Sequence, residues 1–251
     1  MITNRILCRH CGSPNISKYG FAPNGKQKYR CQTCKRQSRE NPSNAGYSEE
    51  RKAEILRAYQ ERSSLRGLER TFGVTRGTVI RWLKKKAHQL PRLKKTLIPP
   101  KPHDPSTITL ECDELWSFVR TKANQAWVWL ALCRKTRQVV AFVIGDRSEA
   151  TCRKLWRAIP RAYRRGICYT DFWAAYQAVI PSEQHRPVGK ETGETAHVER
   201  FNNTLRQRLA RFVRKTLSFS KSLLMHEICL RLFIWRYNMD IRQKYLQAVA
   251  V

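Results

Sequence analysis

The segment ITLECDELW, residues 108–116, decides the fold, because it opens the first of three strand-like runs in the second part of the chain. That first run extends to residue 119, and the others span 126–134 and 138–145. The third run, QVVAFVIG, is rich in the β-branched residues that favour strands. Three consecutive strands with short links predict an antiparallel meander.

Helices and strands alternate after the third strand, a pattern typical of parallel strands joined through helices. The expected elements are, in order, a helix at 149–159, a strand at 167–170, a helix at 172–180, a strand at 185–188 and helical structure from 195 to 246 that is broken near 218–220. This order predicts an α/β domain with a mixed sheet over residues 107–251. It also places the end of the first strand beside the fourth, so Asp113 and Asp171 are expected to converge.

Three acids in these elements have the settings of metal ligands. Asp113 lies within the first strand, Asp171 ends the fourth strand, and Glu199 lies at the start of the last helical region. In phosphodiester chemistry, two Mg²⁺ ions about 3.5–4 Å apart activate the attacking oxygen and stabilise the leaving one. Because Mg²⁺ prefers carboxylate oxygens, the sequence predicts a catalytic site for Mg²⁺ or Mn²⁺ at these residues.

Each of the three acids also has a structural interpretation. Asp113 could be a strand acid on a solvated face, Asp171 could cap the helix that follows it, and Glu199 could be a surface acid on a basic helix. Other acids compete with them as ligands: Glu111, which shares a sheet face with Asp113, and Glu191 and Glu194, which lie close to Glu199 in sequence.

Four of the nine cysteines form two CxxC pairs. Cys8 and Cys11 make the first pair, Cys31 and Cys34 the second, and 19 residues separate them. Two pairs at this spacing predict one structural Zn²⁺ held by four thiolates. The alternative, a redox dithiol, requires a nearby thioredoxin-like βαβ unit, which the sequence lacks. Residues 1–42 are therefore predicted to be a zinc-binding module, followed by a short linker at 41–46.

Residues 47–90 have the order of a helix-turn-helix. Gly73 suits the turn between two helices, where a positive φ is often needed, and Thr75 can cap the second helix. The side chains expected to face a DNA groove are Arg76, Thr78, Arg81 and Lys85. The alternative is an ordinary three-helix unit with a solvated basic face. Five prolines make residues 91–106 a stiff, extended connector.

The charge of the chain indicates a polyanionic partner. Its formal net charge is +30, its sequence pI is about 10.4, and the basic excess occurs in both halves. Double-stranded DNA is the expected partner, although charge alone fits a structural RNA binder equally well. The sequence shows no signal-peptide pattern, and its longest apolar run, 126–133, is too short to span a bilayer. We therefore expect a cytoplasmic protein that makes no contact with membranes.

Taken together, these features resemble insertion-sequence-one transposases of the InsA–InsB type. The resemblance rests on the four-cysteine knuckle, the helix-turn-helix, and the D…D…E set that ends in HVERFNNTLRQRLARFVRKTLSFSK, residues 197–221. It implies an RNase H-like catalytic domain with the triad Asp113, Asp171 and Glu199. It also implies that Arg206 is the basic residue seven positions after the glutamate, and that the protein acts on the nucleoid DNA of a bacterium.

The sequence thus predicts a DNA transposase. Such a protein binds the terminal inverted repeats of its element, cleaves DNA strands with the help of metal ions, and transfers the freed ends. Since strand transfer needs two ends, a homodimer or larger assembly on DNA is expected. Two alternatives remain open at this point: a non-enzymatic DNA-binding transcription regulator, and a metal-dependent nuclease that hydrolyses DNA without joining it.

Overall fold

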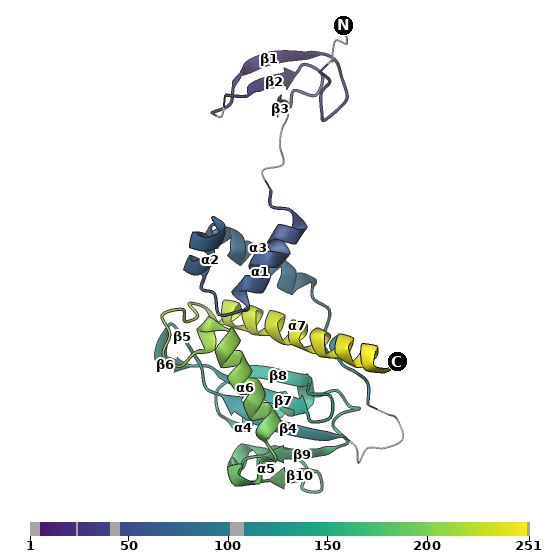
Figure 1. Cartoon of the computed structure of the whole chain (residues 1–251), viewed down its shortest axis with the longest axis vertical. Coiled ribbons are helices and arrows are strands. Elements are labelled where there is room, and N and C mark those ends of the chain that lie inside the picture. The colour runs from purple at the N-terminus through teal and green to yellow at the C-terminus, as the bar shows by residue number, and fades with distance from the viewer. Residues whose placement is uncertain (1–5, 24, 41–45, 101–107, 250–251) are drawn as a thin grey trace. The chain divides into compact units, whose positions relative to one another are not determined.

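The computed structural model describes residues 6–23, 25–40, 46–100 and 108–249. The chain divides into two compact units, Met1–Ser48 and Glu49–Val251. Most of the linker expected at 41–46, and residues 101–106 of the expected proline-rich connector, lie outside the described residues. Figure 1 shows the elements of both units.

The first unit is a small antiparallel sheet. Its strands β1 (Ile16–Phe21), β2 (Gln27–Cys31) and β3 (Gln37–Arg39) follow one another in space in that order. Few apolar side chains are buried in it: among the described residues they are Cys8, Ala22, Tyr29 and Cys31. A core of this size contributes little hydrophobic stabilisation, so the unit depends on another source of folding free energy.

The second unit begins with three helices, α1 (Glu49–Tyr59), α2 (Leu65–Phe72) and α3 (Arg76–Gln89). Gly73 ends α2 with φ of 65°, the left-handed conformation that glycine adopts without strain. The Thr75 hydroxyl accepts a hydrogen bond from the Thr78 backbone N–H at the start of α3, as the sequence predicts. A short 3₁₀ helix, η1 (Leu93–Thr96), follows α3.

A five-stranded mixed sheet forms the centre of the second unit, as predicted. Its strands, in chain order, are β4 (Thr109–Leu115), β7 (Trp127–Cys133), β8 (Val139–Gly145), β9 (Ile167–Thr170) and β10 (His185–Pro187). In space the order is β10-β9-β4-β7-β8. Strand β7 runs in the opposite direction to the other four, so it pairs antiparallel with both β4 and β8, while β9 pairs in parallel with both β4 and β10.

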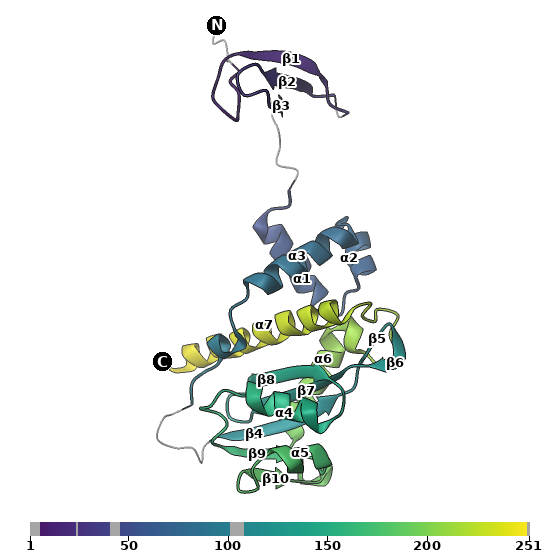
Figure 2. The ribbon, with the colours of Figure 1, turned by 180° about the vertical axis from the view of Figure 1, so that it is seen from behind.

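Helices cover both faces of this sheet. The connecting and terminal helices are α4 (Glu149–Ala158), α5 (Ala174–Val179), η3 (Lys190–Thr192), α6 (Ala196–Arg208), η4 (Ala210–Phe212) and α7 (Leu223–Val249). The front view shows α6 before the sheet, and the view from behind shows α4 and α5 on the other side (Figures 1 and 2). Side chains of β7 alternate accordingly: Trp129 and Ala131 join the core under α4 and α5, whereas Leu130 and Leu132 join the core under α6 and α7.

Two stretches differ from the sequence prediction. The first predicted strand, 108–119, is two strands, because β4 ends at Leu115 and β5 (Phe118–Val119) turns into a hairpin with β6 (Thr121–Gln125). The turn contains Arg120, whose φ is 67°. The helical region predicted from 195 to 246 has a longer interruption than expected, since α6 ends at Arg208 and α7 begins at Leu223.

The helices α1–α3 pack directly against the sheet part of the second unit. Arg62 donates its backbone N–H to the Arg208 carbonyl oxygen (2.6 Å), and Glu61 forms an ion pair with the Arg208 side chain. The Arg211 guanidinium donates to the Tyr59 hydroxyl, which also lies 3.5 Å from the Cys229 sulfur. Helix α7 packs along α3. These contacts join the three helices and the sheet into one compact unit.

A buried polar network supports this contact. His226 is completely buried, and its ring nitrogens lie 3.0 Å from the Ser117 hydroxyl and 2.7 Å from the Ser220 hydroxyl. Burial lowers the pKa of His226 to about 3, and the Arg211 charge acts in the same direction, so the ring is neutral at physiological pH. The network holds the segment between α6 and α7 against β5, where Val119 and Ser220 form a β-bridge.

Replacing Gly166 with alanine is expected to destabilise the β4–β9 pairing. A Cβ atom at this position would lie 2.0 Å from the backbone oxygen of Ile108, and the next residue, Ile167, donates its N–H to that same oxygen. We expect the free energy of unfolding to fall by about 1–3 kcal/mol, as for other overpacked sites, and urea denaturation measures this. The matched variant Gly77→Ala, on the open surface of α3, should change stability by no more than about 1 kcal/mol and in the stabilising direction. Equal effects of the two variants would contradict this account of Gly166.

Candidate active site and cysteine cluster

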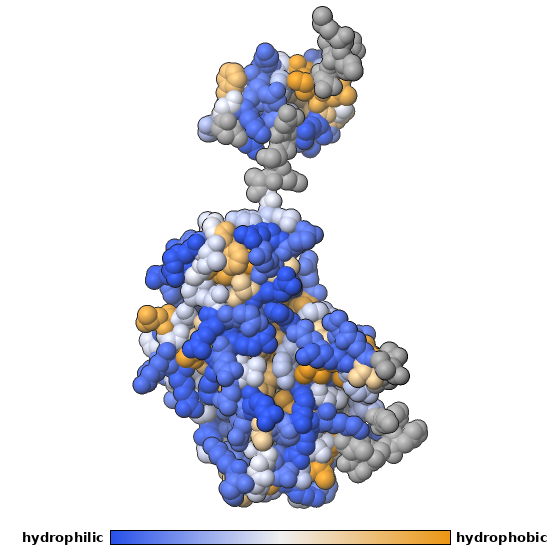
Figure 3. All heavy atoms as spheres, viewed as in Figure 1, coloured by the Kyte–Doolittle hydropathy of each residue, from blue (hydrophilic) through white to orange (hydrophobic). Residues whose placement is uncertain are grey.

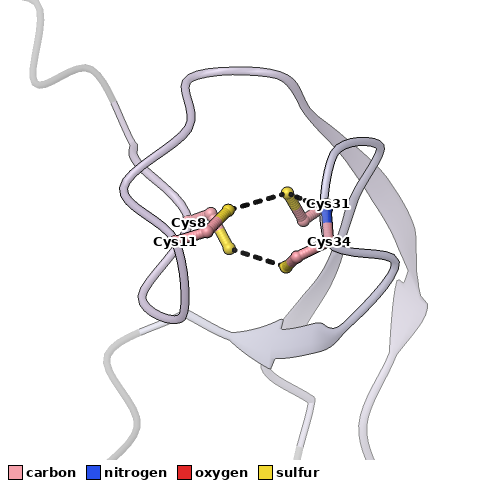
Figure 4. A group of neighbouring side chains, drawn as sticks. All are labelled: Cys8, Cys11, Cys31 and Cys34. Atoms are coloured by element: carbon pink, nitrogen blue, oxygen red, sulfur yellow. Dashed lines mark hydrogen bonds between the residues drawn. The ribbon is translucent and has the colours of Figure 1, made fainter.

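The four cysteines of the two CxxC pairs converge in the first unit (Figure 4). The sulfurs of Cys8 and Cys34 lie 3.6 Å apart, as do those of Cys11 and Cys31. Four sulfurs bound at about 2.3 Å to a tetrahedral Zn²⁺ would be separated by about 3.8 Å, whereas disulfide-bonded sulfurs are about 2.05 Å apart. The cluster therefore has the donor atoms and the spacing of a closed, four-thiolate metal site.

Backbone donors favour the thiolate form in this cluster. The Cys34 N–H lies 3.4 Å from the Cys31 sulfur, and this hydrogen bond, followed by that from Thr33, lowers the pKa of Cys31 to about 6. A thiolate is the form of cysteine that binds metal. The local backbone thus prepares at least one ligand for a cation.

The parallel pairing of β4 with β9 brings Asp113 and Asp171 together. Their last paired residues are Glu111 and Tyr169, and each aspartate follows two residues later. One carboxylate oxygen from each aspartate and one from Glu114 lie within 4.8 Å of one another. The edge of the sheet therefore holds three acids at a spacing that a single cation can bridge.

Burial and mutual repulsion keep two of these acids partly protonated near neutral pH. Burial raises the pKa of Asp113 to about 6, and the charges of Asp171 and Glu199 add to the rise. Burial likewise raises the pKa of Glu114 to about 7, with contributions from Asp171 and Asp113. A divalent cation between these carboxylates would remove the repulsion, so their electrostatics match a metal site.

Glu114 was not predicted from the sequence. Adjacent strand residues point to opposite faces, so strand periodicity gives no reason to place Glu114 beside Asp113. The Glu114 side chain is 2% exposed and pairs with Arg147, whose Nη2 lies 3.1 Å from Oε2. Its other oxygen, Oε1, is buried without a hydrogen-bond partner among the described residues. The two acids in succession, Asp113 and Glu114, were the only signal in the sequence.

Helix α6 presents a row of polar side chains toward this edge. Glu199, Asn202 and Arg206 lie three and then four residues apart, which places them on one helix face. The Asn202 amide donates to Asp113 Oδ2 at 2.7 Å. Glu199 accepts a hydrogen bond from Thr195 (2.9 Å) and lies outside the group of three close carboxylates, although its charge reaches Asp113.

Arg206 is the cation of this row. Burial lowers its pKa and the nearby Arg214 adds to that effect, while the charge of Asp113 opposes it. Its Nε is buried without a hydrogen-bond partner among the described residues. A donor in this state is available to an anionic ligand. Arg206 was predicted from the sequence, whereas Asn202 was not; its only signal in the sequence is an amide three residues after Glu199.

Glu111 has a structural role rather than that of a rival ligand. Its carboxylate is completely buried and accepts hydrogen bonds from the backbone N–H groups of His197 and Val198, at 2.9 and 3.0 Å. It also contacts the His197 ring (2.6 Å) and the Arg134 guanidinium (2.7 Å). A carboxylate at the N-terminus of α6 satisfies free donors and interacts favourably with the helix dipole. Glu111 therefore ties the start of α6 to β4.

Removing this carboxylate is expected to be strongly destabilising. A Glu111→Ala variant leaves Arg134 without its buried partner and two helix N–H groups without an acceptor, so we expect a loss of about 3–5 kcal/mol in the free energy of unfolding. The matched variant Glu194→Ala removes the half-exposed second partner of Arg134 and should cost less than about 1 kcal/mol. Urea denaturation of both proteins measures the difference, and similar losses would show that Glu111 is not an anchor.

The structure also shows the contacts of Asp171 and of the α3 residues that were predicted to face DNA. Asp171 accepts a hydrogen bond from the Trp173 N–H at 3.1 Å, and the helix after it begins at Ala174 rather than at residue 172. On α3, Arg81 and Lys85 are exposed, and Arg76 pairs with Glu69 at 3.1 Å. Thr78 contributes to the cap of its own helix through a contact with Thr75.

Carboxylates gathered at a sheet edge within a strongly basic chain are typical of proteins that act on nucleic acids. A family model described as IS1 transposase matches residues 106–240, which is more than half of the chain. This chain therefore belongs to the IS1 transposase family.

Relatives of known name agree with this assignment. The insertion element iso-IS1n protein InsB of Shigella dysenteriae is 40% identical over 129 residues, covering 51% of this chain and 94% of that protein. The IS1 protein InsB of Shigella flexneri is 38% identical over 120 residues, covering 48% of this chain and 88% of that protein. The IS1 4 protein InsB of Escherichia coli K12 is also 38% identical over 120 residues, covering 48% and 70%. Transposition is the function that family and relatives support.

Among the described residues, no helix combines the length and the apolar character that a membrane span requires.

Proposed function

We propose that this chain is a DDE-type DNA transposase that cleaves the ends of its element and joins them to target DNA. The catalytic residues are Asp113, Asp171 and Glu199. The observation that carries the proposal is the approach of Asp113 and Asp171 at the ends of two parallel strands, with α6 and its Glu199 close enough to influence the Asp113 carboxyl.

The catalytic domain, residues 107–251, has an RNase H-like fold in this proposal. Three features support the assignment: the strand order β10-β9-β4-β7-β8, the single antiparallel strand β7, and the helices on both faces. In this arrangement the central strand β4 supplies the first carboxylate and its parallel neighbour β9 leads into the second. The helix α6 supplies the third.

Divalent ions, Mg²⁺ or Mn²⁺, are the proposed cofactors of this site. When bound, such ions supply Lewis acidity to the attacking and leaving oxygens of a phosphodiester. The residues fit this role, because Asp113, Glu114 and Asp171 offer oxygen ligands within 4.8 Å of one another and two of them have raised pKa values that a cation would lower. We include Glu114 as a fourth carboxylate that shapes the charge of the site.

The other side chains of α6 orient the reaction in this proposal. Asn202 fixes the Asp113 carboxylate through its 2.7 Å hydrogen bond, and the free Nε of Arg206 binds a non-bridging phosphate oxygen of the substrate. Water attacks the phosphodiester at the element end and releases a 3′-OH. That hydroxyl then attacks a phosphodiester of the target in line, which conserves the number of phosphodiester bonds in the joining step.

The parts before residue 106 are the proposed DNA-binding modules. Residues 1–42 bind a structural Zn²⁺ through Cys8, Cys11, Cys31 and Cys34, and residues 47–90 act as a helix-turn-helix, with 91–106 as the connector. The exposed basic side chains of α3 support this role, as Arg76, Arg81 and Lys85 all reach the surface. Their ligand is the double-stranded end of the element, held by a dimer or larger assembly because joining needs two ends.

The test is a cleavage and joining reaction on labelled DNA that carries candidate element ends, with Mg²⁺ or Mn²⁺. Native protein should yield cleaved and joined products, and Asp171→Ala protein should yield neither. Cleavage without joining in the native protein would indicate a nuclease instead. Tight DNA binding without chemistry in either protein, under any metal, would indicate a non-enzymatic regulator.

A further inference from the structure

A groove of about 850 Å³ lies in the second unit, between the helix-turn-helix and the segment that connects α6 with α7. One side is formed by α2 and the first turn of α3, and the other by residues 209–222 and the start of α7. None of the carboxylates of the candidate active site lines it. The groove is therefore separate from the candidate active site.

The lining of the groove is basic. Arg66, Arg70, Arg76 and Lys221 are exposed cations at its surface. Glu69 is the only acid among the described lining residues, and it is paired with Arg76. These cations make the groove attractive to a polyanion. The face of the molecule drawn in Figure 3 is largely hydrophilic.

The groove also carries apolar side chains. Leu217 is 98% exposed, which is unusual for a large apolar residue in a folded segment. The neighbouring Phe219 also lines the groove and packs against Phe118 with ring centroids 5.8 Å apart. Cations that follow a phosphate backbone, next to apolar and aromatic groups that contact bases, are the combination used by proteins that bind single-stranded nucleic acid.

The segment that presents Leu217 is anchored at Ser220, three residues further along the chain. Ser220 forms a β-bridge with Val119, accepts a hydrogen bond from the Arg120 N–H at 2.7 Å, and receives another from Arg211 at 3.0 Å. An apolar side chain close to an anchored point of the backbone can insert between or against bases at a lower entropic cost than one on an unattached loop.

The groove is near the candidate active site along the chain. Phe118, which contacts Phe219, follows Asp113 by five residues, and five extended residues span at most about 17 Å. Successive nucleotides of one DNA strand are separated by about 3.4 Å along the helix axis. With the 5.8 Å between the Phe118 and Phe219 rings added, the Phe219 side of the groove lies within about 23 Å of Asp113, on the order of seven nucleotides at this spacing.

We propose that this groove binds a few unpaired nucleotides of the element end, next to the phosphodiester that is cleaved. Its volume lies at the upper end of the about 300–1,000 Å³ range of small-ligand pockets, enough for short stretches of one strand but too small for a duplex. The inference rests on the proposed function in one respect, because that function identifies the bound strand as part of the element end. Single-strand binding itself requires no catalysis.

The test compares two double variants that each remove two exposed cations. Arg66→Ala/Arg70→Ala changes the groove, whereas Arg81→Ala/Lys85→Ala changes residues of α3 that do not line it. Fluorescence anisotropy of the zinc-loaded full chain, without added Mg²⁺ or Mn²⁺, measures the Kd for a labelled 12-nucleotide oligothymidine and for a 12-base-pair duplex. Leu217→Ala is a third variant, and because this side chain is almost fully exposed its loss leaves the fold unchanged.

The groove variant is expected to weaken oligothymidine binding at least tenfold and duplex binding less than threefold, with Leu217→Ala weakening oligothymidine binding at least threefold. The α3 variant is expected to weaken chiefly duplex binding. Equal loss of oligothymidine binding in both double variants would mean non-specific charge attraction, and a matching loss of duplex binding in the groove variant would mean a duplex occupant. Either result, or unchanged oligothymidine binding, overturns the proposal. Asp171→Ala protein should bind oligothymidine with the same Kd as native protein, because the groove does not include Asp171. The binding measurement therefore tests the groove alone, and the cleavage reaction tests the catalytic proposal.

Discussion

An Asp113→Asn variant is expected to lose metal-dependent cleavage and joining by about 10³-fold or more while becoming more stable as a folded protein. Asparagine has the same size and can still contact Asn202, but it brings no negative charge to the cluster of Asp113, Glu114 and Asp171. A site that relies on electrostatic stabilisation of the transition state loses rate by factors of this order when one contributing group is removed. Quantification of labelled products with Mg²⁺ and with Mn²⁺ measures the loss.

The gain in stability follows from the raised pKa of Asp113, which is about 6 against a reference of 3.8. Between these two values the folded protein binds a proton that the unfolded chain releases, so the charged carboxylate lowers stability as pH rises through this window. Since one pKa unit corresponds to about 1.4 kcal/mol, the metal-free variant should be more stable by about 2–3 kcal/mol at pH 7.5. The gain should be about half as large at pH 5 and should vanish below about pH 4.

Urea denaturation at pH 7.5 and pH 5 without divalent metal measures this difference. The control is Asp240→Asn on α7, whose side chain is 54% exposed and which should change neither activity nor stability. Loss of activity together with loss of stability in Asp113→Asn would mean that the residue maintains the fold instead. An unchanged reaction rate would show that Asp113 is not a catalytic residue.

The second large effect concerns the cysteine cluster. A Cys31→Ser variant is expected to bind no Zn²⁺ at the proposed four-cysteine site and to lose the ordered strands β1–β3, because the first unit buries too few apolar residues to fold without metal. Structural Zn²⁺ in comparable peptides contributes an apparent free energy of about 10–16 kcal/mol. Zinc content per chain and amide hydrogen exchange over residues 6–40 measure the two losses.

The second unit should be unaffected by this change, since Glu49–Val251 forms its own compact core. Its amides should keep their protection in the Cys31→Ser protein. The matched control is Cys133→Ala, a buried cysteine of β7 far from the CxxC pairs in sequence, which should retain one Zn²⁺ per chain. A Cys31→Ser protein that still binds one Zn²⁺ and protects β1–β3 would refute the assignment.

The sequence predicted the strands, the turn and the helix cap that depend on neighbouring residues in the chain. The β-branched run predicted at 138–145 is β8 to within one residue, and residues 167–170 are β9 as predicted. Gly73 and Thr75 occupy the turn and the cap expected of them. These features are local, because strand propensity, a left-handed turn and a helix cap depend on neighbours in the chain. The mixed sheet followed from their order.

The parts that were missed depend on contacts between distant segments. All five residues of β6 are exposed, so no apolar alternation marked this strand, and its pairing with β5 is what makes it one. Glu114 enters the acidic group through the approach of β9. Asn202 is selected only by its contact with Asp113, 89 residues earlier. The spacing of acids in a sequence cannot carry this information, since it arises when the sheet assembles.

The contacts of residues 59–62 with the end of α6 and the segment after it have a geometric consequence. Because Tyr59, Glu61 and Arg62 contact Arg208 and Arg211, folding sets the distance from α3 to the carboxylates. In the proposed function, where α3 binds the element end and the carboxylates cut it, this distance fixes how far along the duplex the cut lies from the recognised sequence. Ten to ten and a half base pairs make about one turn of such a duplex. Inserting about five base pairs between the recognised sequence and the cut would turn the cut phosphate to the far side of the helix, whereas inserting about ten would restore its direction but not its distance.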